Sequence, residues 1–517
     1  MNERLEREDV DVLVVGGSLV GLSAAVFLAA KGVKTTLVEV HTGSHPHPRA
    51  VGYTPRTQEL FDTVGLGSAL PDVPRTFRLR RVSVESLAGR WNEESDWTPK
   101  RSGAEARPVL EHSPHSGAAI AQDRLEPALR DRARELGADL RLGTELVRFT
   151  QDAEAVTAVL REGGGRELEV RARYMIAADG ARSFVRESLG IPRSGPGKLQ
   201  TVRSVLFRAR LDEYLRSGIH QFEIEQPSLR AFLTTYGDDR WVLMFLDDVD
   251  RDDAAERTAI ARAIGRSDIP VEIIVKGQWE LSALITERFS EGRIFIAGDA
   301  AHTLPPTRGG YGANTGIADA HNLAWKLAAV LSGESSPALL ETYDAERRPV
   351  AWTRLEQTFA RPDYAKHSDA FVGQPLIEEA AIELGQLYRS AGILGAGPEL
   401  PVAALPEVWR GQPGTRAPHV WVNDGERVTS TLDLFGRGWV LIAADAHWAD
   451  AADGLPVEVR EVSAEDEAVC EAFGIGKRGT SLVRPDGHVA WRTDDLVDDP
   501  RAALRAAFAR ASFATRI

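Results

Sequence analysis

The stretch from residue 11 to residue 39, DVLVVGGSLVGLSAAVFLAAKGVKTTLVE, constrains the fold more than any other part of the chain. Its unbroken apolar run predicts a buried parallel strand, and the segment from Leu19 to Lys31 predicts a helix directly after a glycine turn. The segment KTTLVE then predicts a second strand. This order predicts an α/β fold with a parallel sheet, in which the helix N-terminus attracts phosphate groups.

The glycine turn departs at one position from the dinucleotide fingerprint G-x-G-x-x-G, because Ser18 stands where the second glycine is expected. Gly16 would permit the tight turn and Gly21 the close packing of the helix on the strand. Glu39 lies near the spacing of the acid that binds a ribose hydroxyl, which disfavours NADP as the tightly bound nucleotide. The turn alone predicts a dinucleotide site without deciding between FAD and NAD, and the alternative is a glycine-rich turn without a ligand.

A second match to the fingerprint, GIGKRG at residues 474–479, stands in the wrong context. It follows a helix-like segment and precedes a strand, whereas a phosphate site needs strand, turn and helix in that order. We therefore interpret it as a loop.

Two further motifs place an acid at the end of a predicted strand. YMIAADGARSFVRESLG (174–190) contains Asp179, and GRIFIAGDAAHTLPPTRGGYGANTGIADAHNLAWKLAAVLSG (292–333) contains Asp299. Such positions are where ligands bind in open α/β sheets, and Asp299 can accept a hydrogen bond from a polyol. Asn314 would cap the helix that follows. Three glycines would let the backbone run close to a flat ring: Gly309, Gly310 and Gly312.

Together these motifs resemble those of the FAD-dependent aromatic hydroxylases, the single-component flavoprotein monooxygenases related to p-hydroxybenzoate and phenol hydroxylase. The resemblance covers essentially the whole chain and includes HPRAVGYTPRTQELF (47–61) and AIAQDRLEPALRDRARELG (119–137). C-terminal pieces such as STLDLFGRGWVLI look like the bacterial branch that tailors aromatic polyketides. That branch carries a thioredoxin-like C-terminal domain, which here has a single cysteine, Cys470, and so no C-x-x-C pair.

The resemblance implies a reaction. NADPH or NADH would reduce the FAD, O2 would add to give a flavin hydroperoxide, and this species would hydroxylate an electron-rich phenol. It also implies a series of FAD contacts: Gly16, Ser18 and Gly21 (pyrophosphate), Glu39 (adenosine ribose), Arg49 and Gln122 (along the FAD), Asp179 (pyrophosphate region), Asp299 (ribityl chain), and Pro306, Gly310, Gly312 and Asn314 (isoalloxazine).

Strand-like runs between residues 200 and 285 predict the wall of a substrate pocket. Alternation places Arg230, Phe232, Thr234 and Tyr236 on one face of RAFLTTY, and Trp241 on a face of WVLMFL. One of these faces should line the pocket, and ordinary sheet packing is the alternative for any single residue. The sequence identifies no catalytic base. The candidate substrate residues are Phe232, Thr234, Tyr236, Trp241 and Pro305.

The length of 517 residues is too great for one core and predicts several domains. We expect an α/β, Rossmann-like FAD-binding domain over 1–190 and 285–395, with an inserted substrate-binding β-sheet domain over 191–284. The segment of roughly 75–118 would join the substrate domain. Residues 400–517 would form the thioredoxin-like domain.

Charge and composition narrow the partners. The net charge of −14 argues against a nucleic acid and against an anionic membrane surface. The charged N-terminus predicts no signal peptide, no apolar run reaches membrane-spanning length, and the lone cysteine favours the cytoplasm. HPHP (45–48) is too short and proline-rich for a structural metal site, so we expect no metal. A small aromatic substrate is the expected partner, and a homo-oligomer stays open.

The sequence therefore favours an NAD(P)H-consuming FAD monooxygenase that hydroxylates a phenolic, polycyclic aromatic natural product of polyketide type. Baeyer–Villiger oxidation or epoxidation on the same scaffold is one alternative, and a non-catalytic protein that binds FAD and an aromatic ligand is another. An NAD-dependent dehydrogenase is disfavoured because it would leave the GD and GGYG elements without a role. The substrate, the position of oxidation and the choice between NADPH and NADH stay open.

Overall fold

The computed structural model describes residues 6–47, 49–77, 79–94, 111–216, 218–306, 310–365, 367–371, 373–423, 427–462 and 466–516. Its first sheet contains the parallel strands expected from the opening stretch, in the order β17-β10-β1-β2-β7. Antiparallel strands extend it, β16 on β17 and β9 with β8 on β10. The strands are β1 (Arg7–Val15), β2 (Thr35–Glu39), β7 (Asp139–Leu142), β8 (Thr144–Gln151), β9 (Val156–Glu162), β10 (Glu167–Ala177), β16 (Ser290–Glu291) and β17 (Ile294–Ile296).

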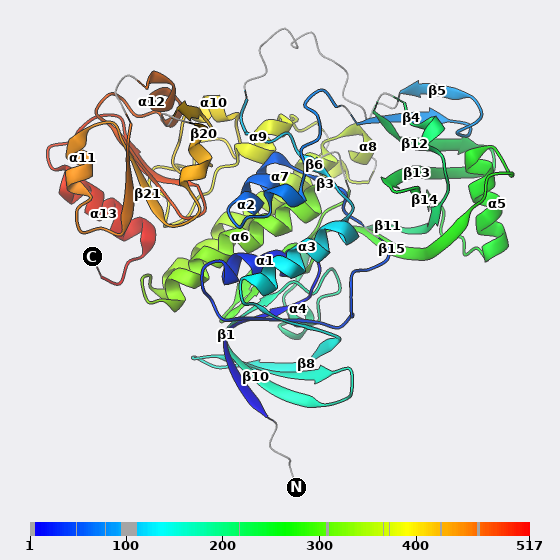
Figure 1. The fold of residues 1–517 in the computed structure, drawn as a ribbon, viewed down its shortest axis with the longest axis horizontal. Helices are drawn as coiled ribbons and strands as arrows, with labels where there is room; N and C mark the ends of the chain where they lie inside the picture. The colour runs from blue at the N-terminus through cyan, green and yellow to red at the C-terminus, as the bar shows by residue number, and fades with distance from the viewer. Residues whose placement is uncertain are drawn as a thin grey trace.

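Helices cover one face of this first sheet, and the antiparallel strands β8 and β9 pack against the other (Figure 1). The first of these helices, α1 (Leu19–Ala29), is buried on nearly every side, since it packs against both α3 (Gln122–Glu135) and α6 (Tyr311–Leu331). This all-round burial explains why α1 is apolar throughout and lacks a polar face. The other helices of this part are α2 (Pro55–Asp62), α4 (Phe184–Ser188), α7 (Thr342–Phe359), α8 (Pro362–Ala365) and α9 (Glu379–Leu384).

A second sheet has the strand order β18-β15-β11-β14-β13-β12-β4-β5. One of its faces packs on α5 (Asp253–Ile264) through an apolar core, and its two longest strands, β11 and β15, run toward the central helices (Figure 1). The bounds are β4 (Arg80–Val84), β5 (Trp91–Glu94), β11 (Arg193–Arg208), β12 (Ile219–Gln226), β13 (Leu229–Gly237), β14 (Arg240–Phe245), β15 (Glu272–Thr286) and β18 (His302–Thr303).

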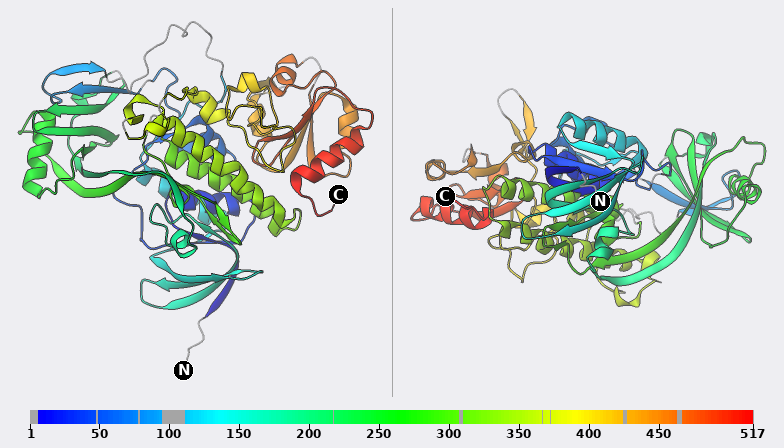
Figure 2. Two further views of the ribbon diagram at one scale, coloured as in Figure 1. Left: turned by 180° about the vertical axis from the view of Figure 1, so that it is seen from behind. Right: turned by 90° about the horizontal axis from the view of Figure 1, so that it is seen from below.

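A four-stranded sheet of order β22-β21-β23-β24 occupies the C-terminal part. Figure 2 shows it on the side of the central helices opposite to the second sheet. GIGKRG lies between α12 and β23, which confirms that it is a loop. The bounds are α10 (Pro406–Trp409), β21 (Trp439–Ala443), α11 (Ala446–Ala451), β22 (Val457–Glu461), α12 (Glu467–Phe473), β23 (Thr480–Val483), β24 (Val489–Thr493) and α13 (Pro500–Ser512).

Two short ladders complete the fold: β3 (Gly52–Tyr53) with β6 (Ala118–Ala119), and β19 (Trp421–Asn423) with β20 (Val428–Ser430). Within the described part of the chain, no helix combines the length and apolarity that crossing a membrane requires.

Candidate active site

One cavity of about 2660 Å³ runs from the turn between β1 and α1 to the second sheet. A typical small-molecule pocket has a volume of roughly 300–1,000 Å³, so this one has room for a dinucleotide and a second ligand. It brings together most of the residues that the sequence singled out, namely Gly16, Ser18, Glu39, Arg49, Gln122, Asp179, Phe232, Thr234, Tyr236, Asp299, Pro306, Gly310 and Gly312.

Glycines shape the backbone at the end of the cavity next to β1. Gly16 has a φ of +104°, and a Cβ there would lie 2.3 Å from the carbonyl oxygen of Ala178. Gly21 does not line the cavity, but a Cβ on it would lie 1.8 Å from the oxygen of Gly16. Only glycine permits this close approach of α1 to the turn, so the N-terminal N–H groups of α1 reach the cavity.

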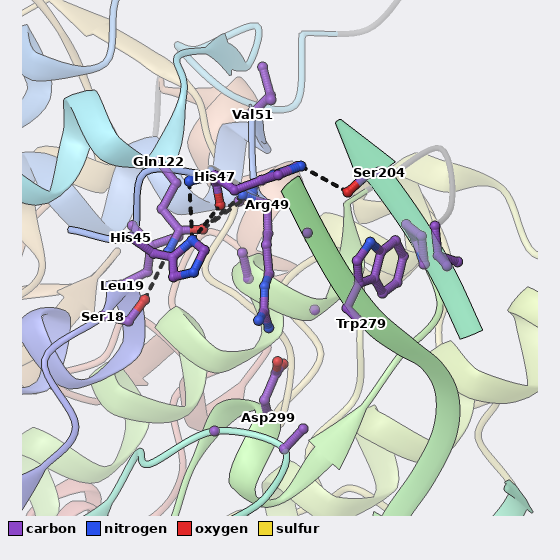
Figure 3. A pocket seen from close by; sticks show the side chains of 18 of the residues that line it. Ser18, Leu19, His45, His47, Arg49, Val51, Gln122, Ser204, Trp279 and Asp299 are labelled. Carbon is purple, nitrogen blue, oxygen red and sulfur yellow. Dashed lines mark hydrogen bonds between the residues drawn. The ribbon is translucent and has the colours of Figure 1, made fainter. Parts of the chain in front are cut away.

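The serine in the fingerprint has a defined set of partners (Figure 3). The Ser18 hydroxyl donates to Glu126 Oε1 at 2.9 Å and accepts from Gln122 Nε2 at 2.9 Å. Gln122 Oε1 in turn accepts from the backbone N–H of Ala50 at 3.3 Å. The serine therefore ties the start of α1 to α3 and, through Gln122, to the loop after β2.

Two carboxylates line the same end of the cavity. Glu39 accepts from the backbone N–H of Gly17 at 2.6 Å, which holds it at the end of β2. Asp179 accepts from the N–H of Val185 at 3.1 Å, and burial raises the pKa of this carboxyl. Both lie at the carboxyl ends of parallel strands, where such sheets bind ligands.

Asp299 lies at the centre of a short 3-10 turn, Gly298–Ala300, and faces into the cavity. Burial raises the pKa of its carboxyl, while His302 and Arg49 act in the opposite direction. Figure 3 shows the Arg49 side chain pointing toward Asp299, although the two residues lie in different motifs of the sequence.

The glycine loop after Asp299 is described in part. Pro306, Gly310 and Gly312 line the cavity, and Gly309 lies outside the described residues. Gly310, with a φ of +57°, is the residue that precedes α6.

The structure corrects the expectations for Asn314. This residue lies inside α6, so it does not cap the helix, and it does not line the cavity. Its side chain accepts from the backbone N–H of Thr54 at 3.1 Å and from the Thr57 hydroxyl at 2.6 Å. Asn314 thus joins α6 to the start of α2, a contact between distant segments that helix-cap rules do not foresee.

The face of β13 that carries Phe232, Thr234 and Tyr236, the candidate substrate wall, lines the cavity. Thr234 donates to the carbonyl of His220 at 3.0 Å, and burial raises the pKa of the Tyr236 hydroxyl. The Arg81 guanidinium lies 4.7 Å from the centre of the Phe232 ring. This wall is half-buried and combines aromatic with polar side chains, as small-molecule sites commonly do.

Two substrate candidates point elsewhere. Trp241 is fully buried in the core under α5, and its Cα partner on β13 is Thr235 rather than Phe232 or Thr234. It therefore belongs to the opposite face of the sheet, and the expectation that it lines the pocket is wrong. Pro305 is buried between Leu304 and Pro306, which both line the cavity, so this extended segment turns Pro305 away from it.

The cavity also contains residues that the sequence did not single out. His47 Nε2 lies 3.0 Å from the Ser204 hydroxyl, and Trp279 of β15 also lines the cavity (Figure 3). Strand alternation along β11 and β15 was the available signal, but it gives no indication of which face meets the loop that carries His47.

These features fit FAD. The glycine turn and helix N-terminus suit a pyrophosphate, Glu39 suits a ribose, and Asp299 suits the hydroxyls of a ribityl chain. A cavity wall of aromatic and polar residues continues beyond them toward the second sheet. The fold and site thus define a flavoprotein with a separate place for an aromatic substrate.

Comparison with known proteins agrees with this class. The FAD binding domain family matches residues 9–358, and the aromatic-ring hydroxylase C-terminal family matches residues 410–511. Tetracenomycin B2 monooxygenase-dioxygenase of Streptomyces olivaceus is 40% identical over 98% of this chain and 99% of its own length. 4-Methyl-5-nitrocatechol 5-monooxygenase of a Burkholderia species is 40% identical over 96% of each chain.

Among solved structures, aklavinone-11 hydroxylase in complex with FAD and aklavinone has a TM-score of 0.87 and 36% sequence identity, and the match covers 99% of this chain and 100% of that one. The chain therefore belongs to the family of FAD-dependent aromatic-ring hydroxylases. It is an FAD-dependent aromatic monooxygenase.

Proposed function

We propose that this monooxygenase hydroxylates a phenolic, polycyclic aromatic compound of polyketide type. The observation that carries the proposal is the single cavity with two ends, a dinucleotide end at Gly16 and Glu39 and an aromatic wall at Phe232. The names of the relatives, a tetracenomycin enzyme and an aklavinone hydroxylase, agree with a fused-ring substrate.

When bound, FAD would supply the redox chemistry, with NADPH or NADH as electron donor and O2 as the source of the inserted oxygen. The protein's own residues would bind and orient the cofactor and the substrate. The turn at Gly16 and the acids Glu39 and Asp299 would fix the cofactor along the first sheet. The β13 wall would hold the substrate ring in the part of the cavity beyond the cofactor.

The twelve residues predicted to contact FAD fall into two groups, those that line the cavity and those that do not. Ten of them line the cavity, and we propose them as direct contacts: Gly16, Ser18, Glu39, Arg49, Gln122, Asp179, Asp299, Pro306, Gly310 and Gly312. Gly21 would act through backbone packing. Asn314 would act only by holding α6 against the segment that contains Gly52.

We also propose the domain division given above, with an inserted substrate domain and a thioredoxin-like C-terminal domain. Its support is the separation of the strands into three larger sheets. In the C-terminal sheet, β22 and β21 are parallel and β23 and β24 antiparallel, with α12 on one face and α11 and α13 on the other. With Cys470 as the only cysteine, this domain would have no dithiol chemistry.

The test is oxidation of NADPH and of NADH by the FAD-loaded protein, with and without a panel of polycyclic phenols. The proposal predicts that a phenol stimulates oxidation and yields a product heavier by one oxygen atom that comes from labelled O2. A product with a ring-inserted oxygen or an epoxide would assign the alternative oxidation to this site. Oxidation that no phenol stimulates would contradict the proposed substrate class.

A further inference from the structure

Asp319 is a fully buried acid in the middle of α6 that does not line the cavity. Its carboxylate accepts three hydrogen bonds. Oδ2 accepts from the backbone N–H of Gly298 at 3.2 Å and from His302 Nε2 at 2.7 Å, and Oδ1 accepts from Arg347 Nε at 2.7 Å. All three partners are donors, so the site requires a carboxylate rather than an amide.

The first two donors bracket Asp299. Gly298 immediately precedes it, and His302, the first residue of β18, follows it by three residues, so one carboxylate oxygen holds the chain on both sides of Asp299. The turn also lies tightly on α6, because a Cβ on Gly316 would stand 2.9 Å from the Gly298 Cα. The direction of the Asp299 side chain is therefore coupled to α6 through Asp319.

The third donor, Arg347, keeps the Asp319 carboxylate ionised. Although burial opposes ionisation, Arg347 and His302 hold the pKa of Asp319 at about 2. Arg347 is itself fixed, because it donates to the carbonyl of Thr315 at 3.1 Å and to the Tyr388 hydroxyl at 2.7 Å. A buried charge that is paired and hydrogen-bonded in this way can hold a defined geometry.

We propose that Asp319 is a positioning residue for the flavin site, which fixes the turn Gly298–Ala300 so that Asp299 faces the cofactor. The inference rests on the proposed contact between Asp299 and FAD.

The first variant is Asp319→Asn. Its amide N–H2 must face one of the three donors, so the turn loses a hydrogen bond and Arg347 loses its counter-charge. We expect the FAD dissociation constant to rise at least about tenfold. With FAD at saturation, the midpoint potential of the bound flavin should differ from the parent's, because the Asp299 carboxylate is no longer held in the position from which it faces the cofactor. A purely structural role would leave that potential unchanged.

The matched control is Glu346→Gln. Glu346 is equally buried and ionised, since Lys326 and Arg484 lie 2.8 Å and 2.6 Å from it, but it does not contact the turn. We expect it to lower the melting temperature as Asp319→Asn does, while FAD affinity stays within about twofold of the parent, as for distant independent sites. Equal loss of FAD affinity in both variants would overturn the inference.

A second pair decides the question if Asp319→Asn does not fold. His302→Gln can keep an N–H donor toward Asp319, whereas His302→Leu removes it. The inference predicts near-parental FAD affinity for the glutamine variant and weakened affinity for the leucine variant, and equal affinities would contradict it.

Asp299→Asn distinguishes a failure of the proposed contact between Asp299 and FAD from a failure of the positioning role of Asp319. If this variant binds FAD as the parent does, the proposed contact of Asp299 fails. If it weakens FAD binding while Asp319→Asn does not, only the role of Asp319 fails.

Discussion

The two ends of the cavity are built differently. At the dinucleotide end, the backbone defines the site, since glycines set the turn and their missing side chains allow the close approach of α1. At the substrate end, side chains on one face of β13 define the wall, while the opposite face of the same sheet forms a core under α5. Where the backbone forms the site, few substitutions are tolerated at the glycine positions. Where side chains form it, the ligand can change through substitutions that leave the fold intact.

The largest expected effect separates the two faces of the second sheet. Trp241→Ala should lower the free energy of unfolding by about 3–5 kcal/mol, because it empties a fully buried core position. Phe232→Ala, on the cavity face, should cost clearly less. Urea denaturation of both variants measures this. A small stability loss for Trp241→Ala together with a raised KM would place Trp241 at the substrate instead.

The next effect tests the backbone end. Gly21→Ala adds a Cβ 1.8 Å from the Gly16 oxygen, so α1 must shift, at a cost of about 1–3 kcal/mol of stability. We expect this variant to be isolated without flavin. Gly164→Ala is the control, because a Cβ there meets nothing within 4 Å. A Gly21→Ala protein with a normal flavin spectrum would refute the packing argument.

A comparable effect, on FAD binding rather than on stability, is expected for a side chain at the same end. Glu39→Gln removes the charge that would accept from the ribose hydroxyls, a loss of about 1.5–3 kcal/mol in FAD binding, or roughly tenfold to a hundredfold in the dissociation constant. Flavin fluorescence titration measures it, with the exposed Glu135→Gln as control. Unchanged affinity would show that Glu39 only orders the turn through Gly17.

The smallest effect concerns the substrate wall. Phe232→Leu removes a ring that contacts Arg81 and faces the cavity, and a change of this size in a pocket is worth about 1 kcal/mol, or roughly fivefold in kcat/KM for the phenol. FAD affinity and stability should stay close to the parent. Steady-state kinetics with the best phenol provides the measurement, and an effect confined to stability would contradict the assignment of the wall.

The contrast between the ends also explains what the sequence could predict. The strand, turn and helix of the opening stretch have local signals, so the parallel sheet, α1 and the loop nature of GIGKRG followed from residues 11–39 and 474–479. Gly16 and Asp299 line a common cavity because each follows the end of a parallel strand, and their roles toward FAD stay predictions.

The missed features depend on contacts between distant segments. Strand alternation grouped Phe232 with Thr234, and Trp241 with its own neighbours on β14. It could not tell which face of the sheet lines the cavity, because that depends on α5 packing against the face that carries Trp241. The hydrogen bond between His47 and Ser204 joins residues 157 positions apart, and no local sequence pattern predicts it. Asn314 likewise bonds to Thr54, 260 residues away, where a helix cap was expected.

The most direct test of the account is a crystal structure of the protein with FAD and a polycyclic phenol that stimulates NAD(P)H oxidation. The account predicts the pyrophosphate at the N-terminus of α1, the ribose at Glu39, the ribityl chain at Asp299, and the aromatic rings against Phe232 and Thr234. A phenol bound on the Trp241 face, or an FAD that does not reach Asp299, would contradict the two-ended cavity.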